Sequence, residues 1–455
     1  MRIRFDRGTL VLEAETAGED PASIPQATWD DEIHAWRVPA ELHADVVVRI
    51  SDMRVRISDE IGPTRLVGHW DLPPLRWYQE RALAAWEHAG RRGVVALPTG
   101  SGKTLVALAA IAKLGAAALI LVPTRVLLEQ WARVLAAVYS HEIGRLGDGD
   151  HQSAPITVAT YASATSWAPR IGDHFGLVIV DEAHHVGAWC PPEVLEMLPA
   201  AARLGLTATP PDEDGALARH VGRVVYALSI GDLAGEALAP FELRTVPITL
   251  TPDERTRYGR MRSRFASEYA RHARQNGKAD WNAFVRGASR SDEGRAAIDA
   301  WRAYRGLVAY STGKRRVLRD LLARHAEERT LVFTADNATA YAIARELLVM
   351  PVTHEIGRVE RADVLARFRA GELSVLVSSQ VLDEGLDVPD ADVAIIVGGT
   401  ASARRHVQRI GRVLRPRPGK RAIVYELEVA DTLEVDYVER RRRLVHGRLA
   451  SGEAT

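Results

Sequence analysis

Short apolar runs alternate with longer amphipathic stretches through most of the chain. The runs predict buried strands, and the stretches between them repeat apolar residues three and four positions apart, as helices do. The predicted strands cover residues 94–97, 118–122, 156–160, 177–180 and 204–206 in the first half, and 330–333, 351–353, 375–377, 393–397 and 422–425 in the second. This alternation predicts the α/β fold class, with two parallel-sheet domains.

The first 70 residues follow a different pattern. Apolar and polar residues alternate over residues 3–12, around a turn that contains Gly8, which predicts a β-hairpin. Trp29 and Trp36 lie farther along. Exposed aromatic side chains beside arginines can stack on bases, but in so small a domain we expect both indoles in the core. We therefore expect a small α+β domain over residues 1–70.

Residues 253–306 interrupt the alternation in the second half. Their pattern is helical, and they hold thirteen Lys or Arg residues against seven Asp or Glu. A solvated helix face and a nucleic-acid surface both explain such an excess of positive charge. We expect a basic helical arm here, inserted in a second α/β domain at 236–455. A linker at 71–74 opens the first α/β domain, which we expect at 71–235.

Composition narrows the functional classes. Of the 455 residues 47% are apolar, and 59 Lys or Arg residues balance 59 Asp or Glu, so that any surface for a polyanion must be local. Cys190 is the only cysteine, which excludes a disulfide within the chain and a zinc site built from cysteines; we expect a buried thiol. No apolar run reaches the roughly twenty residues of a membrane span, and the first residues build no signal core. We expect a cytoplasmic protein with no membrane partner.

A glycine-rich loop follows the strand predicted at 94–97. Its sequence is Leu97-Pro98-Thr99-Gly100-Ser101-Gly102-Lys103-Thr104, and a helix is predicted directly after it. The two glycines let backbone N–H groups turn toward a phosphate, Lys103 can reach the β- and γ-phosphates, and Thr104 can ligate Mg²⁺. Residues 98–104 therefore predict a site for a nucleoside triphosphate with Mg²⁺.

Two acidic residues end the strand predicted at 177–180. Asp181 and Glu182 stand at the strand end, where parallel sheets bind their ligands. We expect Asp181 to hold Mg²⁺ and Glu182 to orient the attacking water, because phosphoryl transfer needs a positioned nucleophile. His184 and His185 come next, but adjacent residues do not share a helical face, so we expect no zinc site there.

Two further motifs surround this pair in the first α/β domain. Thr207 and Thr209 end the following strand, where two hydroxyls could link the acidic motif to the rest of the domain. Upstream of the loop, Arg76 and Gln79 fall in a segment that could read adenine, although a simple helix start explains them nearly as well. The sequence leaves these alternatives open.

Candidate nucleotide contacts also occur in the second α/β domain. Arg412 and Arg415 are three residues apart on a predicted helix, and therefore on one side of it, and Gln408 precedes them. An arginine that approaches the γ-phosphate stabilises transition-state charge, while a surface helix with salt bridges is the plainer interpretation. Gly385 permits close backbone approach, and Asp387 could bind the ribose or Arg415.

Taken together, these motifs resemble a known family. Their order is that of the superfamily 2 helicase motifs, and the chain resembles, more narrowly, the archaeal and bacterial XPB-type DNA repair helicases. The segments that carry the resemblance are Gly100 to Thr104, Val122 to Arg125, Glu129 to Trp131, Thr157 to Tyr161, Asp181-Glu-Ala-His184 with the doubled histidine, Thr207-Ala-Thr209, Ser378 to Gly385 and Gln408 to Pro416.

The resemblance implies an ATP- and Mg²⁺-dependent DNA helicase or translocase that moves 3′ to 5′ and acts in DNA repair. It implies two RecA-like domains, with the arm at 253–306 as a helical thumb and residues 1–70 as a damage-recognition domain. Single-stranded or forked duplex DNA is the expected partner, with contacts from Thr124, Arg125, Thr160, Arg262, Arg264 and Ser379. Family members often act with a nuclease, and we expect a monomer.

One motif departs from the family pattern. After Thr209 the family carries Arg-Glu-Asp, which is linked to strand separation, whereas this chain has Asp212-Glu213-Asp214. The missing arginine motivates an alternative: an ATP-switched DNA-binding module, or a double-strand translocase that needs a partner to separate strands. An RNA remodeller is a further alternative. ATP hydrolysis is expected in each case.

Overall fold

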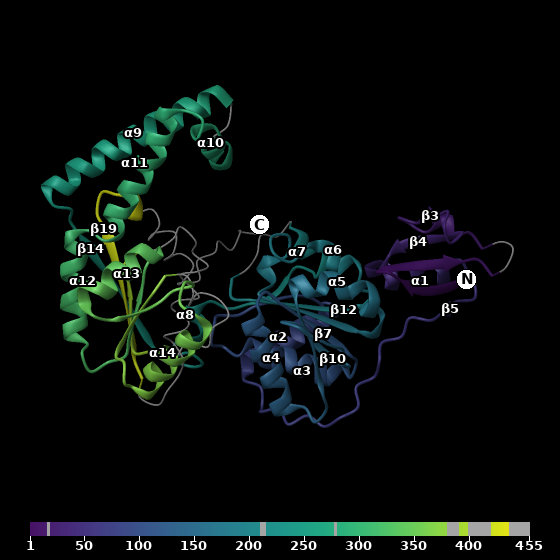
Figure 1. The fold of residues 1–455 in the computed structure, drawn as a ribbon. Coiled ribbons are helices and arrows are strands. Elements are labelled where there is room, and N and C mark those ends of the chain that lie inside the picture. Colours follow the sequence, from purple (N-terminus) through teal and green to yellow (C-terminus); the bar gives the residue numbers. More distant parts are fainter. Residues whose placement is uncertain (16–18, 210–214, 277–279, 380–390, 399–419, 436–455) are drawn as a thin grey trace, which may run out of the picture. The chain divides into compact units, whose positions relative to one another are not determined.

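The computed structural model describes residues 1–15, 19–209, 215–276, 280–379, 391–398 and 420–435. The chain divides into two compact units, Met1–Leu228 and Ser229–Thr455. The first unit contains a small N-terminal sheet and a large α/β sheet, and the second contains another α/β sheet with a helical insertion (Figure 1). In the described part of the chain, no helix combines the length and the apolar character needed to cross a membrane.

The N-terminal sheet has five short strands in the order β3-β4-β2-β1-β5. Strands β1 and β2 pair antiparallel, which confirms the predicted hairpin, and its turn residues Arg7 and Gly8 both have positive φ, as a tight hairpin turn requires. Ile3, Leu10 and Ile50 belong to its core. The elements are β1 (Arg2–Asp6), β2 (Thr9–Glu13), β3 (Thr28–Asp30), β4 (Ala35–Pro39), α1 (His43–Asp52) and β5 (Ser58–Asp59), with 3₁₀ turns at Pro21–Ser23 and Ala40–Leu42.

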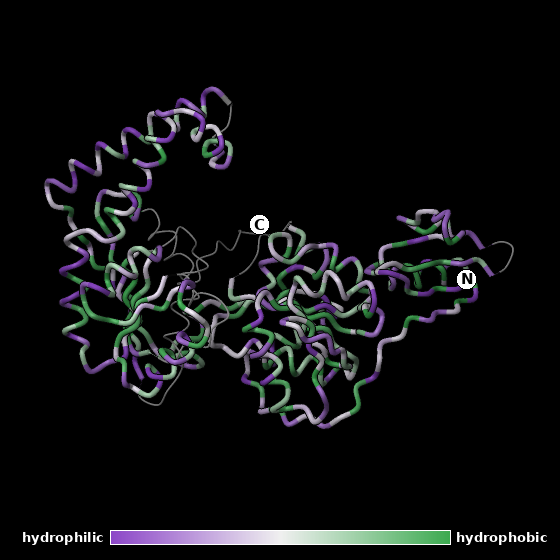
Figure 2. The backbone as a smooth tube through the Cα atoms, in the orientation of Figure 1, coloured by the Kyte–Doolittle hydropathy of each residue, from purple (hydrophilic) through white to green (hydrophobic). Residues whose placement is uncertain are grey.

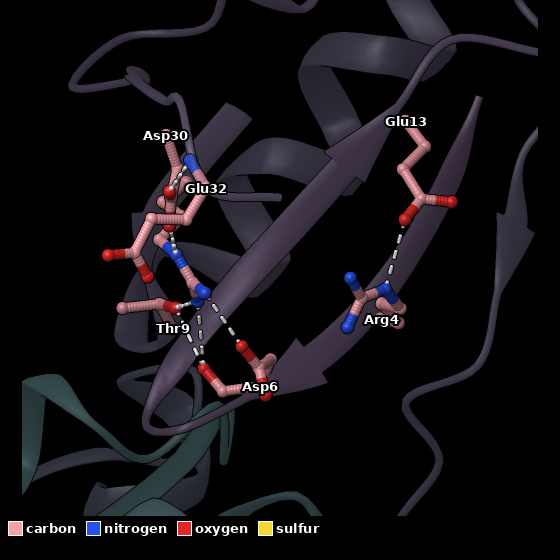
Figure 3. A network of polar contacts seen from close by, with 7 residues as sticks. Arg4, Asp6, Thr9, Glu13, Asp30 and Glu32 are labelled. Carbon is pink, nitrogen blue, oxygen red and sulfur yellow. Dashed lines mark hydrogen bonds and ion pairs between the residues drawn. The ribbon is translucent and has the colours of Figure 1, made fainter. Parts of the chain in front are cut away.

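The expectation that Trp29 belongs to this core is wrong. Trp29 is 48% exposed, because it lies on β3, the outermost strand, where it packs edge-on against Trp36 of the neighbouring strand. Trp36 is partly buried against the core. Beside them Arg37 bonds the carboxylates of Asp6 and Asp30 and ties the hairpin to β3 (Figure 3). The ion pairs of Arg37, and not a buried Trp29 indole, therefore link the edge strand β3 to the hairpin.

The first α/β sheet has the order β13-β6-β12-β11-β7-β10-β8-β9, and every pair in it is parallel except β8 with β9. Helices α2, α3 and α4 lie on one side of the sheet, and α5, α6 and α7 lie on the other (Figure 1). The strands are β6 (Arg92–Ala96), β7 (Ala118–Val122), β8 (Ile143–Gly147), β9 (Asp150–Gln152), β10 (Ile156–Thr160), β11 (Leu177–Asp181), β12 (Ala202–Thr207) and β13 (Val224–Ala227); the helices are α2 (Trp77–His88), α3 (Lys103–Leu114), α4 (Arg125–Val138), α5 (Tyr161–Ile171), α6 (Pro192–Glu196) and α7 (Ala216–His220).

This strand order decides where the sequence motifs lie. Strands β6, β12, β11, β7 and β10 are consecutive neighbours, and each is followed directly by one of the motifs. Because the strands are parallel, their carboxyl ends share one edge of the sheet. Motifs that are separated by up to about a hundred residues in sequence therefore meet at one edge.

The second α/β sheet is parallel throughout, in the order β14-β19-β18-β15-β17-β16. Figure 2 shows the central strands of both large sheets as hydrophobic segments. The strands are β14 (Phe241–Ile248), β15 (Thr330–Phe333), β16 (Met350–Val352), β17 (Val375–Ser378), β18 (Val393–Ile396) and β19 (Ala422–Val429); the helices outside the insertion are α8 (Ile230–Leu233), α12 (Thr312–Arg324), α13 (Asn337–Leu347) and α14 (Arg358–Ala370). All ten predicted strands are confirmed, with ends that move by a few residues at most.

The arm predicted at 253–306 is helical, as expected. It consists of α9 (Pro252–Asn276), α10 (Trp281–Ala288) and α11 (Asp292–Ala309), and α9 packs along α11 (Figure 1). Phe265, Phe284 and Tyr304 join an aromatic cluster between these helices. The arm therefore has a small apolar core of its own, while most of the charged side chains of α9 are exposed.

Candidate functional site

The glycine loop lies between β6 and α3, as predicted. Gly100 and Gly102 have φ of +86° and +80°, which places both in the left-handed region that glycine adopts without strain. Helix α3 begins at Lys103, and its N-cap residue Gly102 makes no side-chain capping bond, so that the positive end of the helix dipole faces the loop. The Lys103 ammonium donates to the carbonyl oxygens of Leu97 (3.0 Å) and Pro98 (3.4 Å). This geometry fits the phosphates of a nucleotide.

Two side chains of α2 hold this loop from behind. The Gln79 amide donates to the carbonyl oxygens of Ser101 (3.0 Å) and Gly102 (3.3 Å), and its oxygen accepts from the Arg76 N–H (2.9 Å). The Tyr78 hydroxyl donates to the same Ser101 oxygen at 2.6 Å. Gln79 is 3% exposed, and in this structure its amide stabilises the loop through these hydrogen bonds. Sequence reasoning missed the role of Tyr78, because nothing in the motif distinguishes it from a core aromatic.

Asp181 ends β11 and is almost completely buried. Its carboxylate accepts from the Glu182 N–H (Oδ1, 2.9 Å) and from the Trp131 indole N–H (Oδ2, 2.8 Å). Burial raises the pKa of Asp181, while the Trp131 bond and the charge of Lys103 act in the opposite direction. The Asp181 carboxylate and the hydroxyl of Thr104, the second residue of α3, are hard oxygen donors of the kind that Mg²⁺ prefers, so the chemistry of this donor set fits Mg²⁺ bound with a nucleotide.

Glu182 has φ of +48°, a conformation that few residues other than glycine adopt. Its Oε2 lies 3.4 Å from Nδ1 of His184, and the same Nδ1 lies 3.1 Å from the Thr207 hydroxyl. Thr207 in turn donates to the Thr209 carbonyl at 2.9 Å. The two threonines are therefore joined to the acidic motif through His184. These contacts help to keep the main chain of Glu182 in its strained left-handed conformation.

The residues expected to contact DNA form two groups, one in each unit of the chain. Thr124 and Thr160 are the N-cap residues of α4 and α5, which follow the adjacent strands β7 and β10, and Arg125 is exposed beside Asp148. Arg262 and Arg264 are exposed on α9, whereas Ser379 is fully buried, with its hydroxyl bonded to Asn337. The remaining expected site residues, Gly385, Asp387, Gln408, Arg412 and Arg415, lie outside the described residues, as does Asp212.

Three protein-family profiles match the chain in sequence order. Residues 3–61 match the Xeroderma pigmentosum group B helicase damage recognition domain. Residues 72–212 match the res subunit of type III restriction enzymes, and residues 313–417 match the helicase conserved C-terminal domain.

Solved structures support the same fold. The Hef helicase domain of Pyrococcus furiosus matches with a TM-score of 0.56 and 20% identity, over 81% of this chain and 98% of that chain. Dbp5 of S. cerevisiae matches with a TM-score of 0.53 and 18% identity, over 81% of this chain and 87% of that chain. These likenesses show the fold alone, two RecA-like α/β domains, and they confirm the predicted fold class.

Curated relatives match over nearly the whole chain. The DNA 3′-5′ translocase XPB2 of Sulfurisphaera tokodaii is 34% identical, over 97% of this chain and 99% of the relative. The DNA 3′-5′ helicase XPB of Mycobacterium tuberculosis is 32% identical, over 97% of this chain and 72% of the relative. This chain therefore belongs to the XPB family of superfamily 2 DNA helicases and translocases.

Proposed function

We propose that the protein is an ATP-dependent DNA helicase or translocase of 3′ to 5′ polarity that acts in DNA repair. One observation supports the proposal most directly. The glycine loop, the acidic pair and the two N-cap threonines all lie at the carboxyl ends of neighbouring parallel strands. Membership of the XPB family supports DNA as the polymer and the 3′ to 5′ direction. ATP hydrolysis and DNA binding are thus proposed at the same edge of the sheet.

The proposed roles follow from what each side chain bonds now. Lys103 holds two loop carbonyls and can exchange them for phosphate oxygens without leaving the loop. Asp181 and Thr104 are the proposed Mg²⁺ ligands; when bound, Mg²⁺ neutralises charge that develops on the phosphates. Glu182 is proposed to orient the attacking water and take its proton, with its carboxylate steadied by His184.

The second unit is proposed to complete the site. By their place in the family motifs, Arg412 and Arg415 would stabilise charge on the γ-phosphate, and Gly385, Asp387 and Gln408 would contact the nucleotide. Adenine recognition by Arg76 and Gln79 also stays a proposal. Its test is a comparison of ATP with GTP in a Gln79→Ala variant.

The function is tested by DNA-stimulated ATP hydrolysis. The Glu182→Gln variant should still bind ATP but lose turnover, because it removes the carboxylate that orients water. Glu193→Gln, exposed on α6, a helix that contacts the Ala40–Leu42 turn of the N-terminal sheet domain, is the matched control and should hydrolyse ATP like the unaltered protein. Undiminished DNA-stimulated hydrolysis by Glu182→Gln would contradict the assignment.

A second candidate is a translocase that does not separate strands by itself, which Asp212 in place of the family's arginine favours. Displacement of a third strand from a DNA triplex reports translocation, and displacement from a forked duplex reports unwinding. Displacement of the third strand without opening of the fork supports this candidate, and Asp212→Arg should then raise fork opening. ATPase stimulation by RNA instead of DNA would favour an RNA remodeller.

The proposal extends to partners and location. We propose single-stranded or forked DNA as the substrate, a nuclease as a protein partner, and a monomer in the cytoplasm as the working form. Repeating the fork assay with candidate nucleases tests the partner, and sedimentation with and without DNA tests the monomer. A stable dimer whose ATPase activity depends on dimerisation would overturn the monomer.

A further inference from the structure

Two buried aromatic side chains hold Asp181 at two different points. The indole N–H of Trp131, from α4, donates to the carboxylate oxygen Oδ2 at 2.8 Å. The hydroxyl of Tyr161, the first residue of α5, donates to the main-chain oxygen of Asp181 and lies 3.3 Å from that of Glu182. Both aromatic residues are 2% exposed. The position of the acidic residue is therefore set by two helices and not by its own strand alone.

The same two helices begin at the threonines that are expected to contact DNA. Thr124 caps α4 and lies seven residues before Trp131, about two helical turns. Thr160 caps α5 and directly precedes Tyr161. A helix transmits displacement along its axis as a nearly rigid body, so a shift at either cap moves the aromatic donor that follows it.

The carboxylate of Asp181 has little freedom left. Oδ1 accepts the Glu182 N–H at 2.9 Å and Oδ2 accepts the Trp131 N–H, which together fix the plane of the group. The lone pairs that these bonds do not use are the ones left for an ion. Hydrogen-bond partners that orient a ligating carboxylate in this way contribute to the metal affinity of the site, in addition to the ligand itself.

We propose that Trp131 and Tyr161 are positioning residues that couple DNA contact at the caps of α4 and α5 to the placement of the Mg²⁺-binding carboxylate of Asp181. The inference rests on the proposed function, since it takes the Mg²⁺ and DNA roles from there. Neither aromatic residue touches the nucleotide in this scheme. Trp131 acts on the carboxylate and Tyr161 on the main chain behind it.

The chain offers a matched control for each substitution. Trp86 is also 2% exposed and donates its indole N–H at 2.9 Å, but to the carbonyl of Arg203, near the start of β12 and so at the opposite end of that strand from Thr207. Tyr139 is 6% exposed and donates its hydroxyl to Val67 at 2.7 Å. Trp86→Phe and Tyr139→Phe therefore lose a buried hydrogen bond of the same kind, away from Asp181.

The first test measures nucleotide binding rather than turnover. The affinity for a fluorescent N-methylanthraniloyl-ADP is compared in excess Mg²⁺ and in excess chelator. Trp131→Phe should raise the Mg²⁺ concentration needed for half-maximal binding about tenfold or more, the range typical of lost partners of metal ligands, and should leave the affinity in chelator unchanged. Trp86→Phe should change neither value, and Trp131→His, which keeps a ring N–H donor, should restore part of the loss.

The second test measures the coupling itself. In the unaltered protein, DNA should change the affinity for Mg²⁺-ADP by some factor, and Mg²⁺-ADP must change the affinity for DNA by the same factor. Trp131→Phe and Tyr161→Phe should each bring this factor toward one, while Tyr139→Phe should leave it unaltered. Should Trp131→Phe fail to fold, Tyr161→Phe carries this test alone.

The outcomes separate the inference from the function it rests on. If the unaltered protein shows DNA-stimulated hydrolysis and Trp131→Phe matches Trp86→Phe in Mg²⁺ requirement and in coupling, the inference is overturned and the function stands. If the unaltered protein shows no DNA-stimulated hydrolysis, the proposed function itself fails.

Discussion

The amide nitrogen of Gln79 occupies the space that a side chain on Gly102 would need. A Cβ built on Gly102 would lie 2.6 Å from Nε2 of Gln79, and φ there is +80°. Gly90 has a similar φ of +71°, but a Cβ on it meets nothing within 4 Å. A substitution at Gly90 would introduce backbone strain alone, whereas a substitution at Gly102 would introduce the same strain and a steric clash with Gln79.

Gly102→Ala should destabilise the protein more than Gly90→Ala does. Both substitutions carry the left-handed strain of about 1 kcal/mol, and Gly102→Ala adds about 1 kcal/mol more, because Gln79 must give up its bonds to the loop. The free energy of unfolding, measured in urea, reports both values. In a Gln79→Ala background the difference between the two glycine variants should vanish; a difference that persists there would show that Gln79 is not its cause.

A buried arginine in the first unit depends on a carboxylate from the N-terminal sheet domain. Arg203 has no exposed side-chain surface, and its guanidinium lies 3.4 Å from the Glu41 carboxylate, which also lies 2.9 Å from Nδ1 of His220. Burial lowers the pKa of Arg203 to about 10, while Glu41 acts in the opposite direction. Four main-chain carbonyls accept its other N–H groups, so Glu41 supplies the countercharge.

Glu41→Gln should therefore lower the free energy of unfolding by about 2 kcal/mol, somewhat less than the loss of a typical buried partner, since the carbonyls remain. Glu13→Gln is the control, because its pair with Arg4 is partly exposed and should contribute less than about 1 kcal/mol. Urea unfolding of both variants checks the prediction. Equal losses would show that burial does not matter at Glu41.

The exposed arginines of α9 should contribute to DNA binding through charge alone. Within the described part of the chain, no ion pair involves Arg262 or Arg264, whereas Arg295 and Arg302 on α11 pair with Asp292 and Asp299. Replacing Arg262 and Arg264 together by alanine should weaken binding of single-stranded DNA and reduce the slope of log affinity against log salt by about 1.4. Replacing Arg295 and Arg302 together by alanine should leave the slope unchanged. A slope that is also unchanged in the Arg262 and Arg264 double variant would show that these two arginines do not contact DNA phosphates.

Cys190 should be inert at neutral pH and should make stability depend on pH only in alkali. Burial raises the pKa of its thiol from 9.0 to about 12, so that at pH 8 only about one molecule in ten thousand carries the thiolate. The folded state keeps this proton where the unfolded state loses it, so its contribution to stability is complete below pH 9 and is lost as the pH rises toward 12. Iodoacetamide should label Cys190 at pH 8 only in urea, and Cys190→Ala should remove this alkaline dependence. Rapid labelling of the native protein would contradict the buried position.

The predicted strands were those with strong local signals. The run 118–122 is apolar without interruption and β7 occupies those same residues, because a strand covered on both faces is apolar throughout. Strand β10 also occupies its predicted residues, 156–160, although Thr157 and Thr160 lie within it. Strand β14 was not predicted, since it lies at the edge of its sheet and its sequence mixes Glu242, Arg244 and Pro247 with apolar residues. Trp29 was misjudged for a related reason: its size favoured the core, and its edge strand offered none.

The sequence by its motifs indicated the family and the α/β class, and it predicts the chemistry of the site, because glycines, a lysine and two acids at fixed spacing are a local pattern that suits phosphate and Mg²⁺. Only the tertiary structure decided what supports them. The order of parallel strands brings Trp131 and Tyr161 to Asp181, and the packing of α2 brings Tyr78 and Gln79 to the loop. These contacts join segments far apart in the chain, and an aromatic residue that packs has the same local pattern as one that also donates a hydrogen bond.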